Sequence, residues 1–173
     1  MPRYAGIISN DTVDVHEGIA VSFWTQGCPH HCEGCHNPDT WDFSKGCELP
    51  KDYIEQIKEL LHKNGVHRSL SILGGEPLCK ENAEIVYNLV SNVKENYPHT
   101  RILLWTGGTF ESLYKKYKHI LKYIDILIDG PFILAKRDIT LPLRGSANQR
   151  VINVQKSIKT KETVIIPDSN LKH

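Results

Sequence analysis

The stretch that decides the fold is 19–37, IAVSFWTQGCPHHCEGCHN, in which a short apolar run leads into three cysteines. The run 19–25 is rich in β-branched and aromatic residues, which predicts a buried β-strand. The loop after it carries Cys28, Cys32 and Cys35 in the spacing Cys-x3-Cys-x2-Cys. Thiolates on so short a loop can converge on one inorganic centre at the end of that strand.

The number of thiolates favours an iron–sulfur cluster over a zinc ion. Zinc in a structural site normally has four protein ligands, whereas three thiolates on a cubane 4Fe-4S cluster leave one iron open for a substrate. The alternative is a zinc site completed by His30, His31, His36 or a distant side chain. The remaining cysteines, Cys47 and Cys79, stand apart in the sequence and are expected to be ordinary small residues rather than ligands.

Apolar runs that predict buried strands alternate with amphipathic helical patterns along the chain. The runs are 19–25, 70–73, 101–106 and 124–128. Residues 7–17 have the pattern of an irregular or hairpin-like beginning, and 151–154 and 163–166 could each add a strand. This order predicts an α/β fold with a mainly parallel sheet and outer helices. A closed eight-stranded barrel takes about 250 residues, so we expect an open partial (β/α) barrel of about five or six strands.

Each unusual loop lies just after one of these strands. The cysteines follow the first strand, Gly74-Gly75-Glu76-Pro77 the second, Trp105-Thr106-Gly107-Gly108 the third and Asp129-Gly130-Pro131 the fourth. Because the carboxyl ends of parallel strands form the active edge of such folds, we expect the loops to form one site. At the second loop, the backbone carbonyls and the Glu76 carboxylate could accept hydrogen bonds from an amine, although the same sequence can make a plain turn.

Two segments near the end of the chain lack a periodic pattern. In 143–150, LRGSANQR, Arg144 and Arg150 could hold a carboxylate or a phosphate, dock a partner protein, or lie in a solvated loop. The last ~20 residues, rich in Lys and Thr, are expected to form a frayed tail. We therefore expect a domain over 1–155 and a tail over 156–173.

Composition argues against several classes of protein. The chain has 173 residues and a net charge of +1, so we expect no nucleic-acid partner. No apolar run reaches the about 20 residues of a membrane span, so we expect no membrane partner. The first residues lack a signal-peptide pattern, which predicts a cytoplasmic protein. Five cysteines, three of them crowded together, favour metal binding in a reducing compartment over a disulfide framework.

The cysteine spacing, together with GGEP after the second strand, resembles the radical S-adenosylmethionine superfamily. The resemblance implies a 4Fe-4S cluster on Cys28, Cys32 and Cys35, with the methionine amine and carboxylate of S-adenosylmethionine on the open iron. One electron from the cluster would then break the sulfur–C5′ bond and give a 5′-deoxyadenosyl radical. The residues implied for cofactor contact are Gly34, Cys35 and His36 on the adenine side and Gly74, Gly75 and Glu76 at the amino group.

Further segments narrow the resemblance. GCPHHCEGCHNPDTWDF resembles the cysteine loop of activating enzymes for glycyl radical enzymes, and RILLWTGGTFE, DGPF and LRGSANQRVIN are similar to the small activating proteins of anaerobic ribonucleoside-triphosphate reductases. Leu143 stands where this family often has Trp. The resemblance implies hydrogen abstraction from a glycine in the C-terminal loop of the reductase large subunit, with a reducing electron donor such as flavodoxin or ferredoxin. No side chain is assigned a catalytic role, because cluster and cofactor carry the chemistry.

Two alternatives stay open. The first is a radical S-adenosylmethionine enzyme that acts on another glycyl radical enzyme or on a small molecule. The second is a structural zinc-binding adaptor, which would use the cysteine loop without any reaction. The second alternative does not explain why all the unusual loops follow strands that end at the same edge of the sheet.

Overall fold

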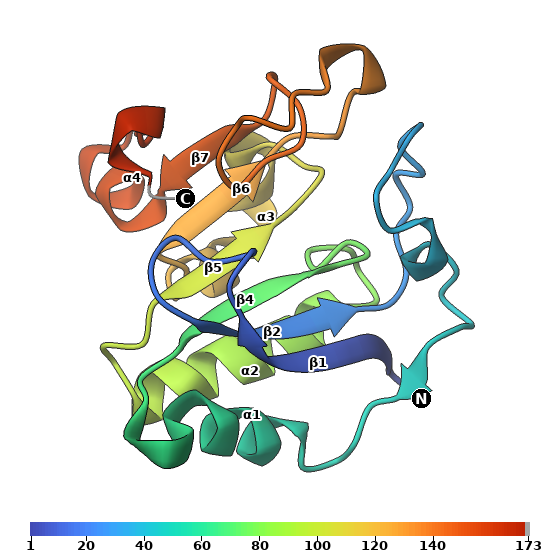
Figure 1. The fold of residues 1–173 in the computed structure, drawn as a ribbon, viewed down its shortest axis with the longest axis vertical. Helices are drawn as coiled ribbons and strands as arrows, with labels where there is room; N and C mark the ends of the chain where they lie inside the picture. The colour runs from blue at the N-terminus through green and yellow to red at the C-terminus, as the bar shows by residue number, and fades with distance from the viewer. Residues whose placement is uncertain (172–173) are drawn as a thin grey trace.

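Parallel strands form the centre of the sheet (Figure 1). They are β2 (Ala20–Thr25), β4 (Ser69–Gly74), β5 (Ile102–Trp105) and β6 (Ile126–Asp129). The computed structural model describes residues 1–171, and these strands overlap the predicted apolar runs. The parallel α/β core is therefore confirmed.

Antiparallel strands extend this core at both ends. The added strands are β1 (Arg3–Asp11), β3 (Cys47–Glu48) and β7 (Arg150–Asn153). They give the seven-stranded order β3-β1-β2-β4-β5-β6-β7, so the predicted count of five or six strands is wrong. The count differs because the two-residue β3 is too short to leave a periodic signal. The antiparallel pairing of β1 with β2 confirms the hairpin-like beginning. Segment 163–166 adds only an isolated bridge between Ile152 and Ile165.

The sheet is open within the part of the chain that the structure describes. Its end strands, β3 and β7, are not neighbours in the strand order, so no barrel is closed. The central strands are parallel, but the pairs at both ends are antiparallel. The mixed α/β class agrees with the sequence, whereas curvature into a partial barrel stays a prediction.

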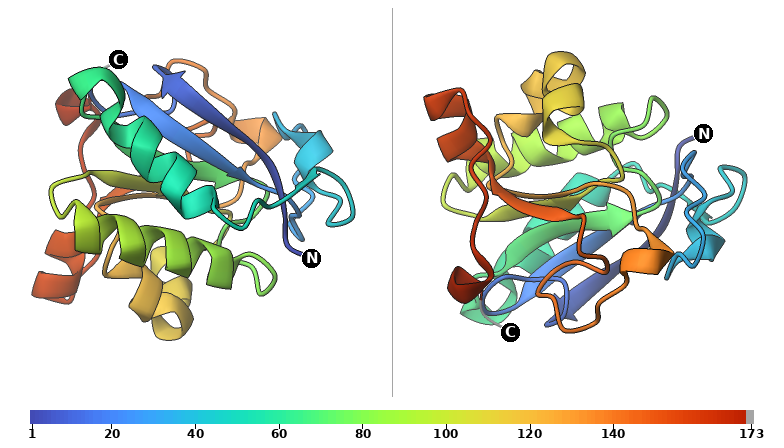
Figure 2. Two further views of the ribbon diagram at one scale, coloured as in Figure 1. Left: turned by 90° about the horizontal axis from the view of Figure 1, so that it is seen from below. Right: turned by 90° about the horizontal axis from the view of Figure 1, so that it is seen from above.

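Helices cover one face of the sheet, which we call the outer face (Figure 2). They are α1 (Tyr53–His62), α2 (Ala83–Asn96), α3 (Phe110–Leu121) and α4 (Val154–Thr160). Single 3-10 turns lie at η1 (Pro38–Thr40), η2 (Lys63–Gly65), η3 (Leu134–Lys136) and η4 (Asp168–Asn170). In α2, Val86, Leu89, Val90 and Val93 recur at helical spacing and are fully buried in the main core. None of the helices in residues 1–171 is long and apolar enough to cross a bilayer.

Segments without regular structure cover the opposite face, which we call the inner face. The Ser22 hydroxyl on β2 donates to the Asp11 carboxylate, and the Ser71 hydroxyl on β4 donates to the Asp14 carbonyl. These contacts hold the β1–β2 connection across both strands. At the other end of the sheet, Leu171 is buried in a second apolar cluster formed by side chains of β5, β6 and β7.

Residues 156–171 are not a frayed tail. The Ile166 N–H donates to the Val151 carbonyl (2.8 Å), and the Asp168 carboxylate accepts two hydrogen bonds from Arg144 (2.8 and 2.9 Å). The expectation is wrong because a few apolar residues, such as Leu171, anchor a segment whose composition is otherwise that of a solvated chain. Residues 172–173 of the predicted tail lie outside the described residues, and a domain boundary at 155 stays a prediction.

Candidate cluster and cofactor site

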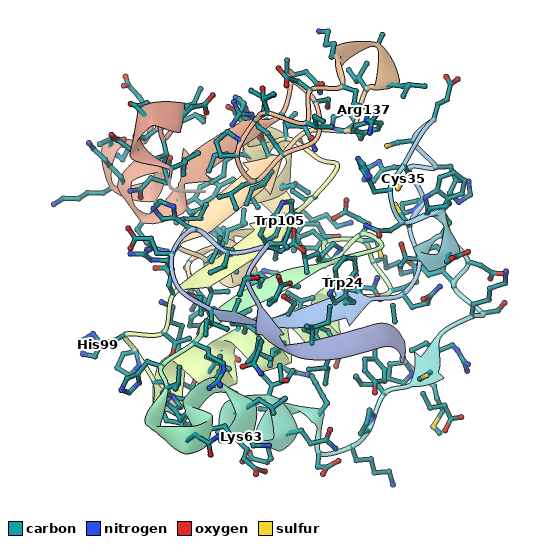
Figure 3. All side chains as sticks on the ribbon, in the orientation of Figure 1. Trp24, Cys35, Lys63, His99, Trp105 and Arg137 are labelled. Atoms are coloured by element: carbon teal, nitrogen blue, oxygen red, sulfur yellow. The ribbon has the colours of Figure 1, made fainter. Side chains whose placement is uncertain are left out.

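The loops after the parallel strands open into one cavity of about 530 Å³. Each loop contributes to its wall, with Cys28 from the first, Glu76 from the second, Gly107 from the third and Gly130 from the fourth. Figure 3 shows Cys35 in the cysteine loop and Trp24 and Trp105 on the sheet, and all of them line this cavity. The loops therefore meet, as their positions after the strands predict.

All the predicted cofactor residues except one line the cavity. Those that do are Cys28, Cys32, Cys35, His36, Gly74, Gly75 and Glu76. Gly34 lies outside this lining. At Gly34 the cysteine loop packs against Leu134 of the η3 turn. Gly34 has φ +75°, and a Cβ there would come within 2.8 Å of Leu134 Cδ1. The assignment of these residues as ligands stays a prediction.

Main-chain contacts fix the base of the cysteine loop. The N–H of Gly27 donates to the Thr40 carbonyl (2.8 Å), and the N–H of Cys28 donates to the Trp41 carbonyl (3.0 Å). Gly27 has φ +96°, and a Cβ there would lie 2.0 Å from the Phe43 ring, so only glycine fits. The loop thus leaves β2 in one direction and carries its free thiols to the cavity.

The environment of Cys28 raises the pKa of this thiol, although two backbone N–H groups act in the opposite direction. Burial raises the pKa of the Cys28 thiol, and the Glu76 carboxylate raises the pKa further. The backbone N–H groups of His30 and His31 lower the pKa, because they hydrogen-bond to the ionised sulfur. A metal centre displaces the thiol proton when it binds, so these N–H groups would then point at a permanent negative charge.

Glu76 is the most heavily bonded side chain of the site. It is 3% exposed, and its carboxylate accepts hydrogen bonds from the Leu78 N–H (2.9 Å), the Thr106 hydroxyl (2.8 Å), the Gly107 N–H (2.8 Å) and His30 Nε2 (2.8 Å). A carboxylate has about four acceptor sites, so this one is fully occupied. Glu76 therefore joins the first, second and third loops, while its contact with an amine stays a prediction.

The histidines of the cysteine loop also have partners. The hydrogen bond to the buried carboxylate raises the pKa of His30, while burial lowers it. His31 stacks on Trp41 with 4.9 Å between ring centroids, and His36 meets Phe132 edge-on at 5.7 Å. Each ring is thus committed to packing or to a hydrogen bond, rather than placed beside a thiol.

The ligand set fits a cluster better than a zinc ion. Within residues 1–171, no group of three His, Cys, Asp or Glu side chains is arranged around a point where a single metal ion could sit. Thiolates on a cubane bond different irons, so they lie farther apart than ligands that share one ion. Cys28, Cys32 and Cys35 are free and line the same cavity.

The second loop packs main chain against main chain on the first. The Gly75 N–H donates to the Thr25 carbonyl (2.9 Å), and the Glu76 N–H donates to the Gly27 carbonyl (2.8 Å). A Cβ on Gly75 would lie 2.2 Å from the Gly27 carbonyl oxygen, and Gly74 has φ +105°. The cavity wall at this point therefore consists of bare backbone, as the GGEP sequence predicts.

Asn82 is a site residue that sequence reasoning missed. Its side chain is 3% exposed, and its amide donates to the carbonyls of Gln26 (3.1 Å) and Glu76 (3.0 Å). It thus ties the second loop to the first from behind the cavity. An isolated Asn before a helix is usually a cap, so the sequence held no signal for this role.

The two arginines of LRGSANQR have different roles. Arg150 is bound by Asp129 (Nε to Oδ1, 2.9 Å) and by Glu111 (Nη2 to Oε2, 2.8 Å). These contacts hold the pKa of Glu111 at about 2, mainly through the Arg150 hydrogen bond. Asp129 also accepts the N–H of Phe110 at the start of α3 (2.7 Å). Arg150 and Asp129 therefore fix the fourth loop and do not face the cavity.

Arg144 does line the cavity. Its side chain is 11% exposed, and its Nη atoms bind the Asp168 carboxylate. Its Nε is buried and has no hydrogen-bond partner among residues 1–171. The neighbouring Leu143 carbonyl accepts the indole N–H of Trp105 (2.7 Å), which joins this segment to β5. Arg144 is thus a wall residue whose position depends on the segment after α4.

Comparison with known proteins gives consistent matches. The 4Fe-4S single cluster domain family matches residues 16–152. A protein of Haemophilus influenzae is 40% identical over 135 residues, covering 77% of this chain and 86% of the relative. A protein of Vibrio cholerae is 38% identical (76% and 86% covered), and one of enterobacteria phage T4 is 38% identical (78% and 83%). All of these relatives are named anaerobic ribonucleoside-triphosphate reductase-activating protein.

Proposed function

The chain belongs to the anaerobic ribonucleoside-triphosphate reductase-activating proteins and contains a 4Fe-4S single cluster domain, and we propose that it activates its reductase by radical S-adenosylmethionine chemistry. The observation that carries the proposal is the single cavity shared by the cysteine loop, the GGEP loop and the ends of β5 and β6. A cluster with one open iron needs an adjoining pocket for the cofactor, and this cavity adjoins all three cysteines.

Within this proposal, the chain supplies ligands, orientation and shielding. Cys28, Cys32 and Cys35 hold the cluster, which when bound supplies the one electron that splits S-adenosylmethionine into methionine and a 5′-deoxyadenosyl radical. The backbone carbonyls at Gly74 and Gly75 accept hydrogen bonds from the methionine amine, and backbone near His36 lies beside the adenine. Glu76 acts as a positioning residue, because its carboxylate is saturated by the loops that it joins.

The proposed substrate is a glycine in the C-terminal loop of the reductase large subunit. One hydrogen atom would leave the glycine Cα for the 5′-deoxyadenosyl group, so a C–H bond would break in the partner and one would form in 5′-deoxyadenosine. The required electron comes from a reducing donor such as flavodoxin or ferredoxin. This partnership follows from the family and from the resemblance, and the proposed cytoplasmic location is the one predicted from the sequence.

Anaerobic reconstitution of wild type beside Cys32→Ala tests the proposal. We expect wild type to bind iron and sulfide and, after reduction and addition of S-adenosylmethionine, to release 5′-deoxyadenosine, whereas Cys32→Ala releases none. Cys47→Ala is the matched control, because Cys47 is exposed and lies on β3, away from the cavity lining. It should behave as wild type.

Addition of the reductase large subunit separates the remaining alternatives. A glycyl radical signal in its electron paramagnetic resonance spectrum is the expected result. Bound zinc without sulfide, or equal product from wild type and Cys32→Ala, would overturn the radical reaction. Product without any glycyl radical on the reductase would instead point to another glycyl radical enzyme or to a small-molecule substrate.

A further inference from the structure

Two of the most exposed large apolar side chains lie on the rim of the candidate site. Val13 is 78% exposed and Ile139 is 79% exposed, and both line the cavity. Val13 comes from the β1–β2 connection and Ile139 from the β6–β7 connection, which both run over the inner face of the sheet (Figure 2). We call this pair the apolar rim. Exposed apolar groups at the mouth of a pocket are typical of a binding surface.

The inner face places an unpartnered donor beside this rim. Ser22 and Trp24 alternate along β2 on the inner face, since Phe23 between them belongs to the outer core. The β1–β2 connection is held to Ser22 through Asp11, so Trp24 is the next inner-face residue toward the cavity. Its indole Nε1 is buried without a hydrogen-bond partner among residues 1–171.

Among residues 1–171, the buried side-chain nitrogen and oxygen atoms of the cavity lining that lack a partner are all donors. The buried, unpartnered atoms of its lining residues are Trp24 Nε1, Trp41 Nε1 and Arg144 Nε. The carboxylate of Glu76, which also lines the cavity, already receives four hydrogen bonds. Indole and guanidinium nitrogens cannot accept hydrogen bonds. A ligand that fits this part of the cavity therefore carries acceptor oxygens, as the carbonyls of a peptide do.

The lining also includes Gly75, Gly107, Gly130 and Gly145. The Cβ positions of Gly75 and Gly107 face atoms of this chain, the Gly27 carbonyl and the His30 ring, so these two glycines serve the contacts between loops. The target segment of the proposed function is centred on a glycine, which brings no side chain of its own into the cavity. Apolar side chains next to that glycine would then remain near the mouth, where Val13 and Ile139 lie.

We propose that the apolar rim of Val13 and Ile139 binds an apolar side chain near the target glycine of the reductase, while the Trp24 indole donates to a peptide carbonyl beside it. This inference rests on the proposed function, because the glycine-bearing segment of the reductase is the occupant. In this proposal, the two connections over the inner face select the peptide. The loops at the strand ends bind the cluster and the cofactor.

Titration of the reconstituted enzyme with a glycine-centred peptide from the reductase, measured by calorimetry, tests this. We expect Val13→Lys and Ile139→Lys each to weaken binding about tenfold, since each loses an apolar contact and places a charge against an apolar group. Trp24→Phe, which keeps a ring but lacks the N–H, should weaken binding about fivefold. Val66→Lys is the control, because Val66 is also exposed but lies before β4, at the opposite edge of the sheet.

A charge-exchange experiment makes the assignment specific. Peptides with Asp at each position near the glycine are titrated against Val13→Lys, and we expect one position to restore at least half of the lost affinity. Wild-type affinity in both rim variants, or equal loss in Val66→Lys, would overturn the inference. Loss of binding that no Asp peptide restores would also overturn it. In each case, wild-type release of 5′-deoxyadenosine and formation of the glycyl radical show separately whether the proposed function stands.

Discussion

The outer and inner faces of the sheet are covered in different ways. On the outer face, long helices bury apolar side chains completely, as Leu89 of α2 and Ile120 of α3 illustrate. On the inner face, connections are held over β2 and β4 by the hydroxyls of Ser22 and Ser71. Apolar burial stabilises a fold in proportion to its area, whereas single hydrogen bonds contribute little net free energy. We infer that the outer face carries the stability and that the inner face and strand ends carry the site.

The largest effect on stability is expected from a cavity in the outer core, because the outer face is inferred to carry the stability. Leu89→Ala should lower the free energy of unfolding by about 3 kcal/mol, since Leu89 is fully buried and its neighbours cannot collapse completely into the space. Urea unfolding measures this. The folded fraction should still bind as much iron per chain as wild type, and a folded variant with half the iron would contradict the division.

A methyl group added at the strand ends should lower activity more than stability. Gly75→Ala places a Cβ 2.2 Å from the Gly27 carbonyl oxygen and separates the first loop from the second. Displacement of about 1 Å at a reacting centre can cost about a hundredfold in rate, so we expect that loss in 5′-deoxyadenosine formation. The free energy of unfolding should fall less than in Leu89→Ala, because the contact lies at the strand ends and not in the outer core.

Gly6→Ala is the matched control for this substitution. Gly6 lies on β1, and a Cβ there meets no atom within 4 Å. Its activity should equal that of wild type. If Gly75→Ala retained full activity, the close contact between the loops would have no importance for the reaction.

Glu76→Gln should lower both the stability and the affinity for S-adenosylmethionine, because this carboxylate joins three loops. An amide keeps the shape but turns one oxygen into a donor, which then faces groups that also donate, such as the N–H of Gly107. We expect a loss of about 2 kcal/mol in unfolding free energy together with weaker S-adenosylmethionine binding. Glu81→Gln, an exposed neighbour, should change neither. Unchanged cofactor affinity would mean that Glu76 does not position the loops.

The smallest effect is expected at Glu111, whose partner Arg150 connects β7 with α3. The folded pKa of Glu111 is about 2, below its ordinary 4.5. Its stabilising contribution is therefore complete above pH 4.5 and is lost as the pH falls toward 2. Because the side chain is 54% exposed, we expect less than about 1 kcal/mol. The urea midpoint should decrease more between pH 6 and pH 3 for wild type than for Glu111→Gln. An equal decrease in both proteins would contradict the assignment.

Sequence alone located the features that depend on periodicity and spacing. The strands of the parallel core follow from apolar runs, and the cysteine loop and GGEP loop follow from their places at strand ends. The cover of the inner face could not be predicted, because contacts such as Ser22 to Asp11 leave no periodic signal. The two-residue strand β3 is too short to detect. The segment ending at Leu171 has a disordered composition and is held by a few apolar residues.

In the site too, contacts between residues far apart in the sequence could not be predicted. GGEP identified Glu76 as a polar residue of the site, but its partners Thr106 and Gly107 lie about 30 residues further along the chain. Which hydrogen bonds a carboxylate makes depends on the strand order, which local sequence does not contain. Its contact with an amine stays a prediction, whereas its role in joining the loops is evident only from the structure.

The contact between Gly27 and Gly75 has a consequence for motion. Side chains exchange between rotamers, but two stretches of backbone in contact, each hydrogen-bonded to the other loop or its strand, have few independent movements. Thermal fluctuation should then displace the cysteine loop and the GGEP loop together, as one body. Under the proposed function, the separation between the cluster site and the backbone carbonyls that face the amine would thus be preserved.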